Sequence, residues 1–151
     1  MMERLFLEIL PENFRHEKSF LIKNELNNSK KLSLLSDYEL SIIQKSCSLC
    51  TLNNLKKIRA VALFKNELSI SPNESYLLLH CGIGSIKSLS TVNPYDLQNR
   101  IGRLERILST KTQTKISLSI LKDWIKRANQ ICKSIWIFVK RFFYCRIWKS
   151  L

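Results

Sequence analysis

Apolar residues recur every three to four positions along most of the chain, in runs that short polar segments separate. This spacing predicts helix in two pieces over residues 1–26, with Pro11 between them, and a polar break at residues 27–31. Ser36 or Asp37 can cap the next helix. Beyond a turn at residues 46–51, the pattern predicts helix again, with apolar positions Leu52, Leu55, Ile58, Val61, Leu63, Phe64 and Leu68.

The second half of the chain carries sharper helix signals. In Ser71-Pro72-Asn73-Glu74, serine can cap a helix, proline suits its first position, and glutamate stands three residues after the cap. Cys81-Gly82-Ile83-Gly84 reads as the turn that follows, and Ser85 as the next cap. Asn93-Pro94 predicts another helix start, and a last helix begins near Ser117 or Ser119 and can continue into the tail.

Two segments of the chain match when one is shifted by 34 residues. The matching pairs are Cys47 with Cys81, Leu49 with Ile83, Leu52 with Ile86, Leu55 with Leu89, and Leu63 with Leu97. Any two amphipathic helical hairpins share such periodicity, so the coincident position of the turn is the more informative feature. We therefore expect a tandem repeat of helical hairpins.

Composition supports a helical fold. The 151 residues include only 3 Gly and 3 Pro, too few for the many tight turns of an all-β protein. We predict an all-α protein with tandem helix-hairpin-helix repeats. The expected organisation is a helical N-terminal extension at residues 1–34, the repeat domain at 35–130, and a basic aromatic tail at 131–151.

The turn at Gly82, Ile83 and Gly84 carries the best candidate chemistry. Glycines permit positive φ and the close approach of another backbone, and the helix that follows presents unpaired N–H groups from Ser85 onward. Such a corner can bind a phosphate oxygen. The alternative is structural, because glycine is also the usual residue at the end of a helix.

These residues resemble the helix-hairpin-helix pattern of DNA-binding proteins. In that family two hairpins usually pair and hold phosphates of both strands without reading bases. The resemblance therefore implies phosphate contacts at Gly82–Gly84, with Lys87 on the following helix able to add another. The first copy departs from the pattern, because Ser48-Leu49-Cys50 stands where glycines are expected.

A closer resemblance is to an uncharacterised helix-hairpin-helix family, domain of unknown function 4332, over roughly residues 35–130. The residues that carry it are Leu77-Leu78-x-x-Cys81-Gly82-Ile83, Ser88-Leu89-Ser90, Asn93-Pro94-x-x-Leu97 and Trp124-Ile125-x-x-Ala128. The resemblance implies a fold. It implies no activity, since the family's own function is unassigned.

Positive charge is concentrated in the second half of the chain. Residues 1–75 carry 11 Lys+Arg and 9 Asp+Glu, a net charge of +2, whereas residues 76–151 carry 14 and 3, a net charge of +11. Such an excess attracts nucleic acid, anionic lipid or an acidic protein. Arg100, Arg103 and Arg106 recur every three residues and could contact phosphates, although charge runs commonly just form a solvated helix face.

The tail at residues 131–151 interleaves aromatic residues with cations. Trp136, Phe142, Phe143 and Trp148 suit a helix lying on an anionic membrane, stacking on single-stranded nucleic acid, or packing against the domain. No run reaches the roughly 18 apolar residues that span a bilayer, and the N-terminus does not read as a signal peptide. We therefore expect a cytoplasmic protein whose 5 cysteines are reduced.

Catalytic and metal signals are weak. Cys47-x-x-Cys50 with His80-Cys81 could supply zinc ligands, but adjacent His80 and Cys81 can hardly bind one ion together, and buried cysteine is common. We expect no cofactor, no metal and no enzymatic activity. The sequence favours a binding module for nucleic acid through Gly82, Ile83, Gly84, Ser85, Lys87, Arg100, Arg103 and Arg106. The alternative is a protein–protein scaffold, which the tail could hold at a membrane.

Overall fold

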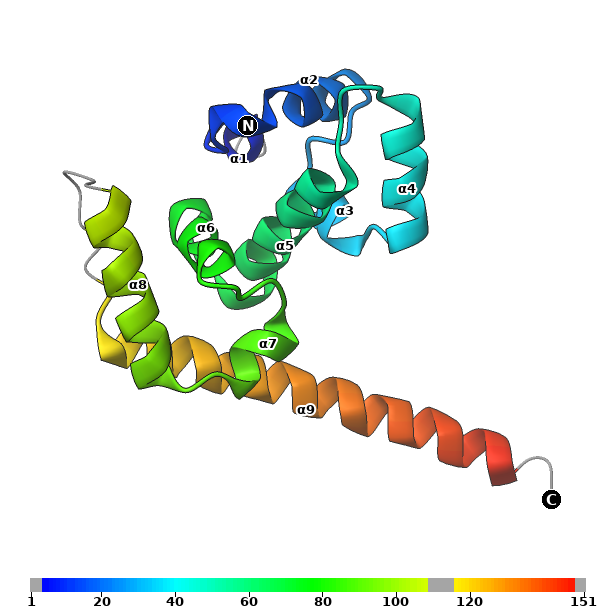
Figure 1. The fold of residues 1–151 in the computed structure, drawn as a ribbon. Coiled ribbons are helices and arrows are strands. Elements are labelled where there is room, and N and C mark those ends of the chain that lie inside the picture. Colours follow the sequence, from blue (N-terminus) through cyan, green and yellow to red (C-terminus); the bar gives the residue numbers. More distant parts are fainter. Residues whose placement is uncertain (1–3, 109–115, 149–151) are drawn as a thin grey trace. The chain divides into compact units, whose positions relative to one another are not determined.

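The structure, a computed structural model, describes residues 4–108 and 116–148, with side chains from Phe6 to Ile107 and from Ile116 to Val139. Every regular element in these ranges is a helix, which confirms the all-α prediction. The chain divides into two compact units, Met1–Gly84 and Ser85–Leu151 (Figure 1). These units do not follow the boundaries predicted after residues 34 and 130.

The first unit contains six α-helices and one short 3₁₀-helix within its described residues. They are α1 (Arg4–Glu8), η1 (Glu12–Phe14), α2 (Arg15–Lys23), α3 (Ser29–Leu34), α4 (Asp37–Ser46), α5 (Leu52–Leu68) and α6 (Pro72–His80). The polar break predicted at residues 27–31 already contains the start of α3. The Asn28 side chain caps that helix, accepting hydrogen bonds from the backbone N–H groups of Lys30 (2.8 Å) and Lys31 (3.3 Å).

Helix α5 is the centre of the first unit, and α3, α4 and α6 pack against it. Its buried residues Ile58, Val61 and Ala62 share a hydrophobic core with six residues from the segment before α4: Phe6, Leu7, Leu10, Phe14, Leu21 and Leu32. Apolar residues of the predicted N-terminal extension are therefore part of this core.

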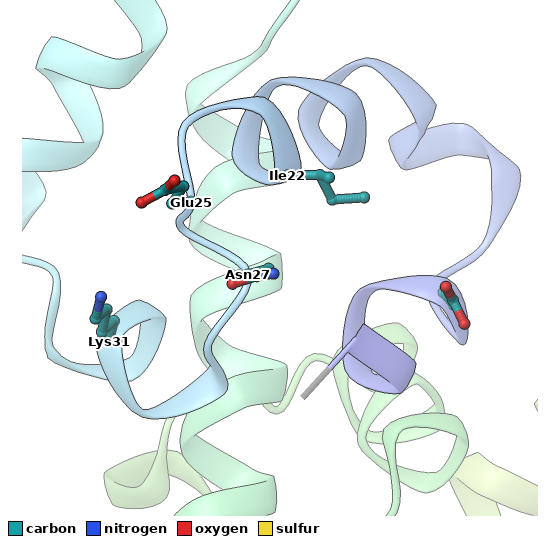
Figure 2. Close-up of a pocket in the computed structure, with 5 residues that line it drawn as sticks. Ile22, Glu25, Asn27 and Lys31 are labelled. Carbon is teal, nitrogen blue, oxygen red and sulfur yellow. The ribbon is translucent and has the colours of Figure 1, made fainter. Parts of the chain in front are cut away.

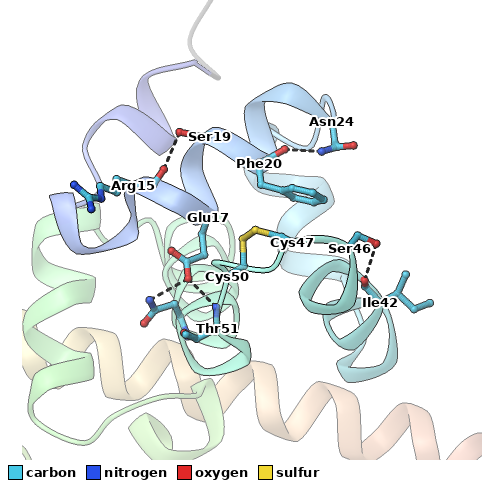
Figure 3. Close-up of a disulfide and its surroundings, with 11 residues drawn as sticks. Arg15, Glu17, Ser19, Phe20, Asn24, Ile42, Ser46, Cys47, Cys50 and Thr51 are labelled. Carbon is cyan, nitrogen blue, oxygen red and sulfur yellow. Dashed lines mark hydrogen bonds between the residues drawn. A yellow bond between two sulfur atoms is a disulfide. The ribbon is translucent and has the colours of Figure 1, made fainter.

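A buried carboxylate ties α2 to the beginning of α5. Glu17 is 1% exposed, and its Oε1 accepts hydrogen bonds from the Thr51 backbone N–H (3.0 Å) and from Asn54 Nδ2 (3.1 Å) (Figure 3). The first N–H groups of a helix have no partner inside the helix, and a carboxylate is favoured at that end. Glu17 thus satisfies the N-terminus of α5 from another element.

An exposed ion pair joins the beginning of α4 to α5. Arg59 donates from Nη1 to the Leu35 carbonyl (2.9 Å) and from Nη2 to Asp37 Oδ1 (2.7 Å), and Lys56 lies 3.5 Å from Asp37 Oδ2. The hydrogen bond and positive charge of Arg59, with the charge of Lys56, hold the pKa of Asp37 below its ordinary value. Hydrogen bonds from Ser36, the cap of α4, likewise lower the pKa of Glu39.

Helix α6 ends in the glycine turn that the sequence predicted. Gly82 has φ +84°, its N–H donates to the Leu79 carbonyl (3.0 Å), and the Ile83 N–H donates to the Leu78 carbonyl (2.9 Å). These two bonds form a Schellman motif, in which a left-handed residue lets the chain satisfy the last carbonyls of a helix. Ile83 is buried, so it anchors the turn.

The second unit is built on one long helix. It contains α7 (Ile86–Thr91), α8 (Pro94–Leu108) and α9 (Leu118–Trp148), and both shorter helices pack against α9. The described core residues are Leu89, Leu97, Ile101, Leu121, Trp124 and Ala128. Asn129 Nδ2 on α9 also donates to the Ser90 carbonyl on α7 (3.0 Å), which fixes the register between these two helices.

We expect Glu17→Ala to lower the free energy of unfolding by about 1–3 kcal/mol, because it leaves partly buried donors at the start of α5 without their acceptor. Glu12→Ala is the matched control, since Glu12 is an exposed glutamate of the adjoining 3₁₀-helix. Urea unfolding of the two variants measures the difference. Equal midpoints would show that the Glu17 hydrogen bonds contribute nothing.

We expect Gly82→Ala to destabilise the protein by about 1–2 kcal/mol, because a Cβ is disfavoured in left-handed backbone even where no atom obstructs it. Gly84 is the internal control, because its surroundings are also open and its φ lies outside the left-handed region. Gly84→Ala should change the stability by less than about 0.5 kcal/mol. Thermal unfolding measures both changes in stability. Equal midpoints for the two variants would contradict the role of the positive φ at Gly82.

Candidate functional site

The glycine turn presents its backbone to solvent, but most of its amides already have acceptors. Gly82 and Gly84 are exposed. The N–H groups of Gly82 and Ile83 close the end of α6, and the Ser85 N–H donates to Ser88 Oγ (3.1 Å). In the described part of the chain, Gly84 is the turn residue whose N–H has no such bond. The turn therefore offers one amide to a ligand where the sequence suggested several.

The predicted cations all lie at the surface of the second unit. Lys87 is exposed on α7, and Arg100, Arg103 and Arg106 are exposed on α8. The buried positions of α8, including Leu97 and Ile101, form its opposite, apolar stripe. The three arginines therefore share one solvent-facing strip, as their spacing predicted.

The acidic residues of the second unit lie next to arginines. Asp96 pairs with Arg100 (2.9 Å), and Asp123 pairs with Arg127. Both pairs are one helical turn apart, the spacing at which opposite charges meet on a helix. Glu105, between Leu104 and Arg106, is the unit's third and last acidic residue. The cations of the unit outnumber these acids, so its surface carries a positive excess.

The segment between α4 and α5 differs from the glycine turn 34 residues later. Leu49 is 64% exposed, whereas its counterpart Ile83 is 3% exposed. Cys47 and Cys50 form a disulfide, so the prediction that all cysteines are reduced thiols was wrong for this pair. The connection between the helices brings their Cα atoms to 5.3 Å, within the range that a disulfide bridges.

The remaining described cysteines do not gather into a metal site. Cys81 is a buried thiol and Cys132 is partly buried, while His80 beside Cys81 is exposed and its ring lies 5.5 Å from the Tyr76 ring. Among the described side chains, no group of three or more His, Cys, Asp or Glu residues lies close enough to hold an ion.

Burial, with the nearby charge of Glu17, raises the pKa of Tyr76.

A groove runs beside the disulfide, and sequence reasoning did not predict it. It has a volume of about 330 Å³, and its lining includes His16, Phe20, Lys23, Cys47 and Leu49. Figure 3 shows the disulfide between α2 and the segment that leads into α5. The Cys-x-x-Cys spacing was the available signal, but only the packing of α2 against this segment reveals the groove.

A second hollow, of about 630 Å³, lies in the first unit between the end of α2 and α3. Figure 2 shows Glu25 and Lys31 on one side of the connecting segment and Ile22 on another. These side chains do not converge on a common point, so the hollow has no arrangement that would orient a reacting group.

Helix α9 exposes an apolar stretch as it extends away from its contacts with α7 and α8. Ile135, Trp136, Ile137, Phe138 and Val139 are each at least 44% exposed. A groove of about 490 Å³ lies alongside, lined by Asn129, Cys132, Lys133, Trp136 and Ile137. Phe142, Phe143 and Trp148, predicted with Trp136 to meet a membrane, have side chains outside the described residues. No described helix has the length and apolar character needed to cross a bilayer.

Comparison with known proteins identifies one relationship. Residues 14–131 match the family described as "Domain of unknown function (DUF4332)". This range begins in the first unit, at Phe14, and includes the turn, the α8 cations and most of the packed part of α9. No curated protein and no solved structure matches the chain. The matched range covers most of the 151 residues, and the chain therefore belongs to this family, DUF4332.

Proposed function

We propose that this protein is a non-catalytic module that binds nucleic acid through the phosphate backbone, without reading the base sequence. The contacts come from Lys87, Arg100, Arg103 and Arg106, all exposed side chains of the second unit. As a separate candidate, the turn at Gly82–Ser85 offers one backbone amide to a phosphate. This proposal keeps the predicted cytoplasmic location.

The observation that supports the proposal is the excess of exposed cations in the second unit. Lys87 is exposed on α7 and Arg103 and Arg106 on α8, while two of the unit's three acids, Asp96 and Asp123, pair with arginines of their own helices. Phosphate contacts by such cations release counterions and supply affinity that is independent of sequence. Arg103 and Arg106 are the cations of α8 that add most to this surface, because Arg100 shares its charge with Asp96.

We also propose that the helices form tandem helix-hairpin-helix repeats. The 34-residue shift superimposes the ends of α4 and α6 at Ser46 and His80, and the starts of α5 and α7 at Leu52 and Ile86. The caps Thr51 and Ser85 also correspond. The exposed Leu49 and the disulfide of the first copy oppose phosphate contact there, so we assign the ligand to the second copy.

We expect the full-length protein to bind a short DNA duplex weakly at low salt, with affinity that falls as salt rises. The charge reversals Lys87→Glu and Arg103→Glu together should weaken binding about tenfold or more. They should also make the slope of log K against log salt less steep by about 1.8, since each lost phosphate contact removes about 0.9. Fluorescence anisotropy over a salt series measures both quantities.

The matched control is Lys30→Glu with Lys31→Glu, two exposed lysines of the first unit that give the same change in net charge. Its effect should be smaller than that of the reversals in the second unit. Equal losses would mean that net charge alone drives binding, and intact binding after the reversals at Lys87 and Arg103 would refute the proposed surface.

A second candidate function rests on the exposed apolar stretch of α9. We propose, as the alternative, an interaction scaffold that docks through Ile135–Val139, with an anionic membrane as the surface that its chemistry fits. From Trp124 to Trp148 the helix sequence contains six Lys or Arg residues and no Asp or Glu: Lys126, Arg127, Lys133, Lys140, Arg141 and Arg146. Apolar side chains combined with cations favour a helix lying in the headgroup region.

We expect the protein to float with phosphatidylserine-containing vesicles, and Trp136→Ser with Ile137→Ser to weaken this binding by about tenfold or more, because each side chain would no longer transfer apolar surface from water. The control is Leu34→Ser with Leu49→Ser, two exposed leucines of the first unit. Vesicle binding that neither pair affects would exclude α9 as the docking helix. A stable protein partner recovered in place of vesicles would favour the protein–protein form of the scaffold.

A further inference from the structure

The disulfide site shares no residue with the proposed nucleic-acid surface. Cys47 and Cys50 stand in the short connection between α4 and α5, where the Cys50 N–H donates to the Cys47 carbonyl (3.1 Å). We propose that this pair is a thiol–disulfide exchange site that accepts a small anionic thiol and carries it as a mixed disulfide on Cys47.

The two sulfurs are not equally accessible. Cys47 is partly exposed and lines the groove, whereas Cys50 is 5% exposed and packs in a core with Leu40, Ile43 and Leu55. Exchange requires the attacking thiolate to approach one sulfur along the S–S bond. An incoming thiol therefore attacks Sγ of Cys47, and Cys50 is the leaving group.

The leaving sulfur lies away from the groove. Cys50 is buried among Leu40, Ile43 and Leu55, whereas Cys47 lines the groove that the incoming thiol enters. The N–H of the next residue, Thr51, already donates to Glu17 and does not serve the Cys50 sulfur. The mixed disulfide therefore forms on Cys47.

The groove selects the charge of the thiol. Its lining contains Lys23 and no Asp or Glu. Arg15 lies outside this lining, and its Nε donates to Nε2 of His16, which lines the groove (3.2 Å). Carboxylates on the incoming thiol thus meet Lys23 in the same groove as Cys47, while Leu49 and Phe20 offer an apolar surface.

The exchange balances without another reagent. The thiol R–SH attacks Cys47, the Sγ–Sγ bond breaks, a Cys47–S–S–R bond forms, and the thiol proton ends on Cys50 Sγ. A second R–SH then releases R–S–S–R and leaves both cysteines as thiols. Two thiols are oxidised to one disulfide, and the protein disulfide, which is the oxidant, is reduced.

The experiment treats the full-length disulfide-bonded protein with reduced glutathione, quenches with acid, alkylates the remaining thiols, and maps the adduct by mass spectrometry. We expect one glutathione per chain on Cys47 and an alkylated Cys50. Glutathione on Cys50, or no adduct in the folded protein when the urea-unfolded protein forms one, would overturn the proposal. Failure of the Cys47–Cys50 disulfide to form with oxidised glutathione would overturn it too.

Variants that lack one of the two disulfide cysteines test whether the two sulfurs differ in accessibility. With oxidised glutathione, Cys50→Ser should accumulate a stable adduct on Cys47. Cys47→Ser should react at Cys50 at least about tenfold more slowly, because that sulfur is buried. Circular dichroism verifies that both variants are folded. Equal rates in two folded variants would contradict the assignment of Cys47 as the accessible sulfur.

A pair of charge reversals tests whether the groove selects an anionic thiol. Arg15→Glu with Lys23→Glu should slow the reaction with glutathione about threefold to tenfold at low salt and slow the reaction with 2-mercaptoethanol less, because that thiol carries no charge besides the attacking thiolate. The matched control is again Lys30→Glu with Lys31→Glu, two exposed lysines that do not line the groove. Equal slowing for both thiols would show that the groove does not select an anion. Duplex binding is a separate measurement, so either proposal can fail alone.

Discussion

The first unit depends on the carboxylate of Glu17 at the beginning of α5. Helices α3, α4 and α6 pack against α5, and both described hydrophobic clusters of the unit include α5 residues, so the position where α5 starts affects where the other side chains meet. A buried ionised group is stable only when its hydrogen bonds are made. Glu17 meets this condition with Thr51 and Asn54, and thereby holds α2 and the Cys47–Cys50 connection in place.

Local signals predicted the helices well, because a cap and its helix lie within a few residues. The capping box at Ser71 and the positive φ of Gly82 are where the sequence placed them, and Ser36 is the cap of the two candidates Ser36 and Asp37. The fate of Glu17 could not be predicted in this way. Nothing near it in sequence marks a burial site, and its partners, Thr51 and Asn54, lie 34 and 37 residues away.

The candidate site was only partly predictable for the same reason. The spacing of Arg100, Arg103 and Arg106 predicted a shared exposed strip, and the periodicity of one helix was enough for this. The free amides predicted at the glycine turn are fewer than expected, because the N–H groups of Gly82 and Ile83 donate to the last carbonyls of α6. The disulfide was not predicted, because cysteines of a cytoplasmic protein are expected to stay reduced and the Cys-x-x-Cys spacing alone does not show that two sulfurs are bonded.

Helix α9 is continuous from Leu118 to Trp148, about 46 Å at the usual rise per residue. Its first turns are clamped by α7 and α8, so the helical backbone of Ile135–Val139 extends from an already nucleated segment. A surface that binds this stretch therefore contacts a helix that is already formed, and no disordered segment has to fold on binding. Association through α9 would therefore lose little conformational entropy, and a small contact could suffice for reversible attachment.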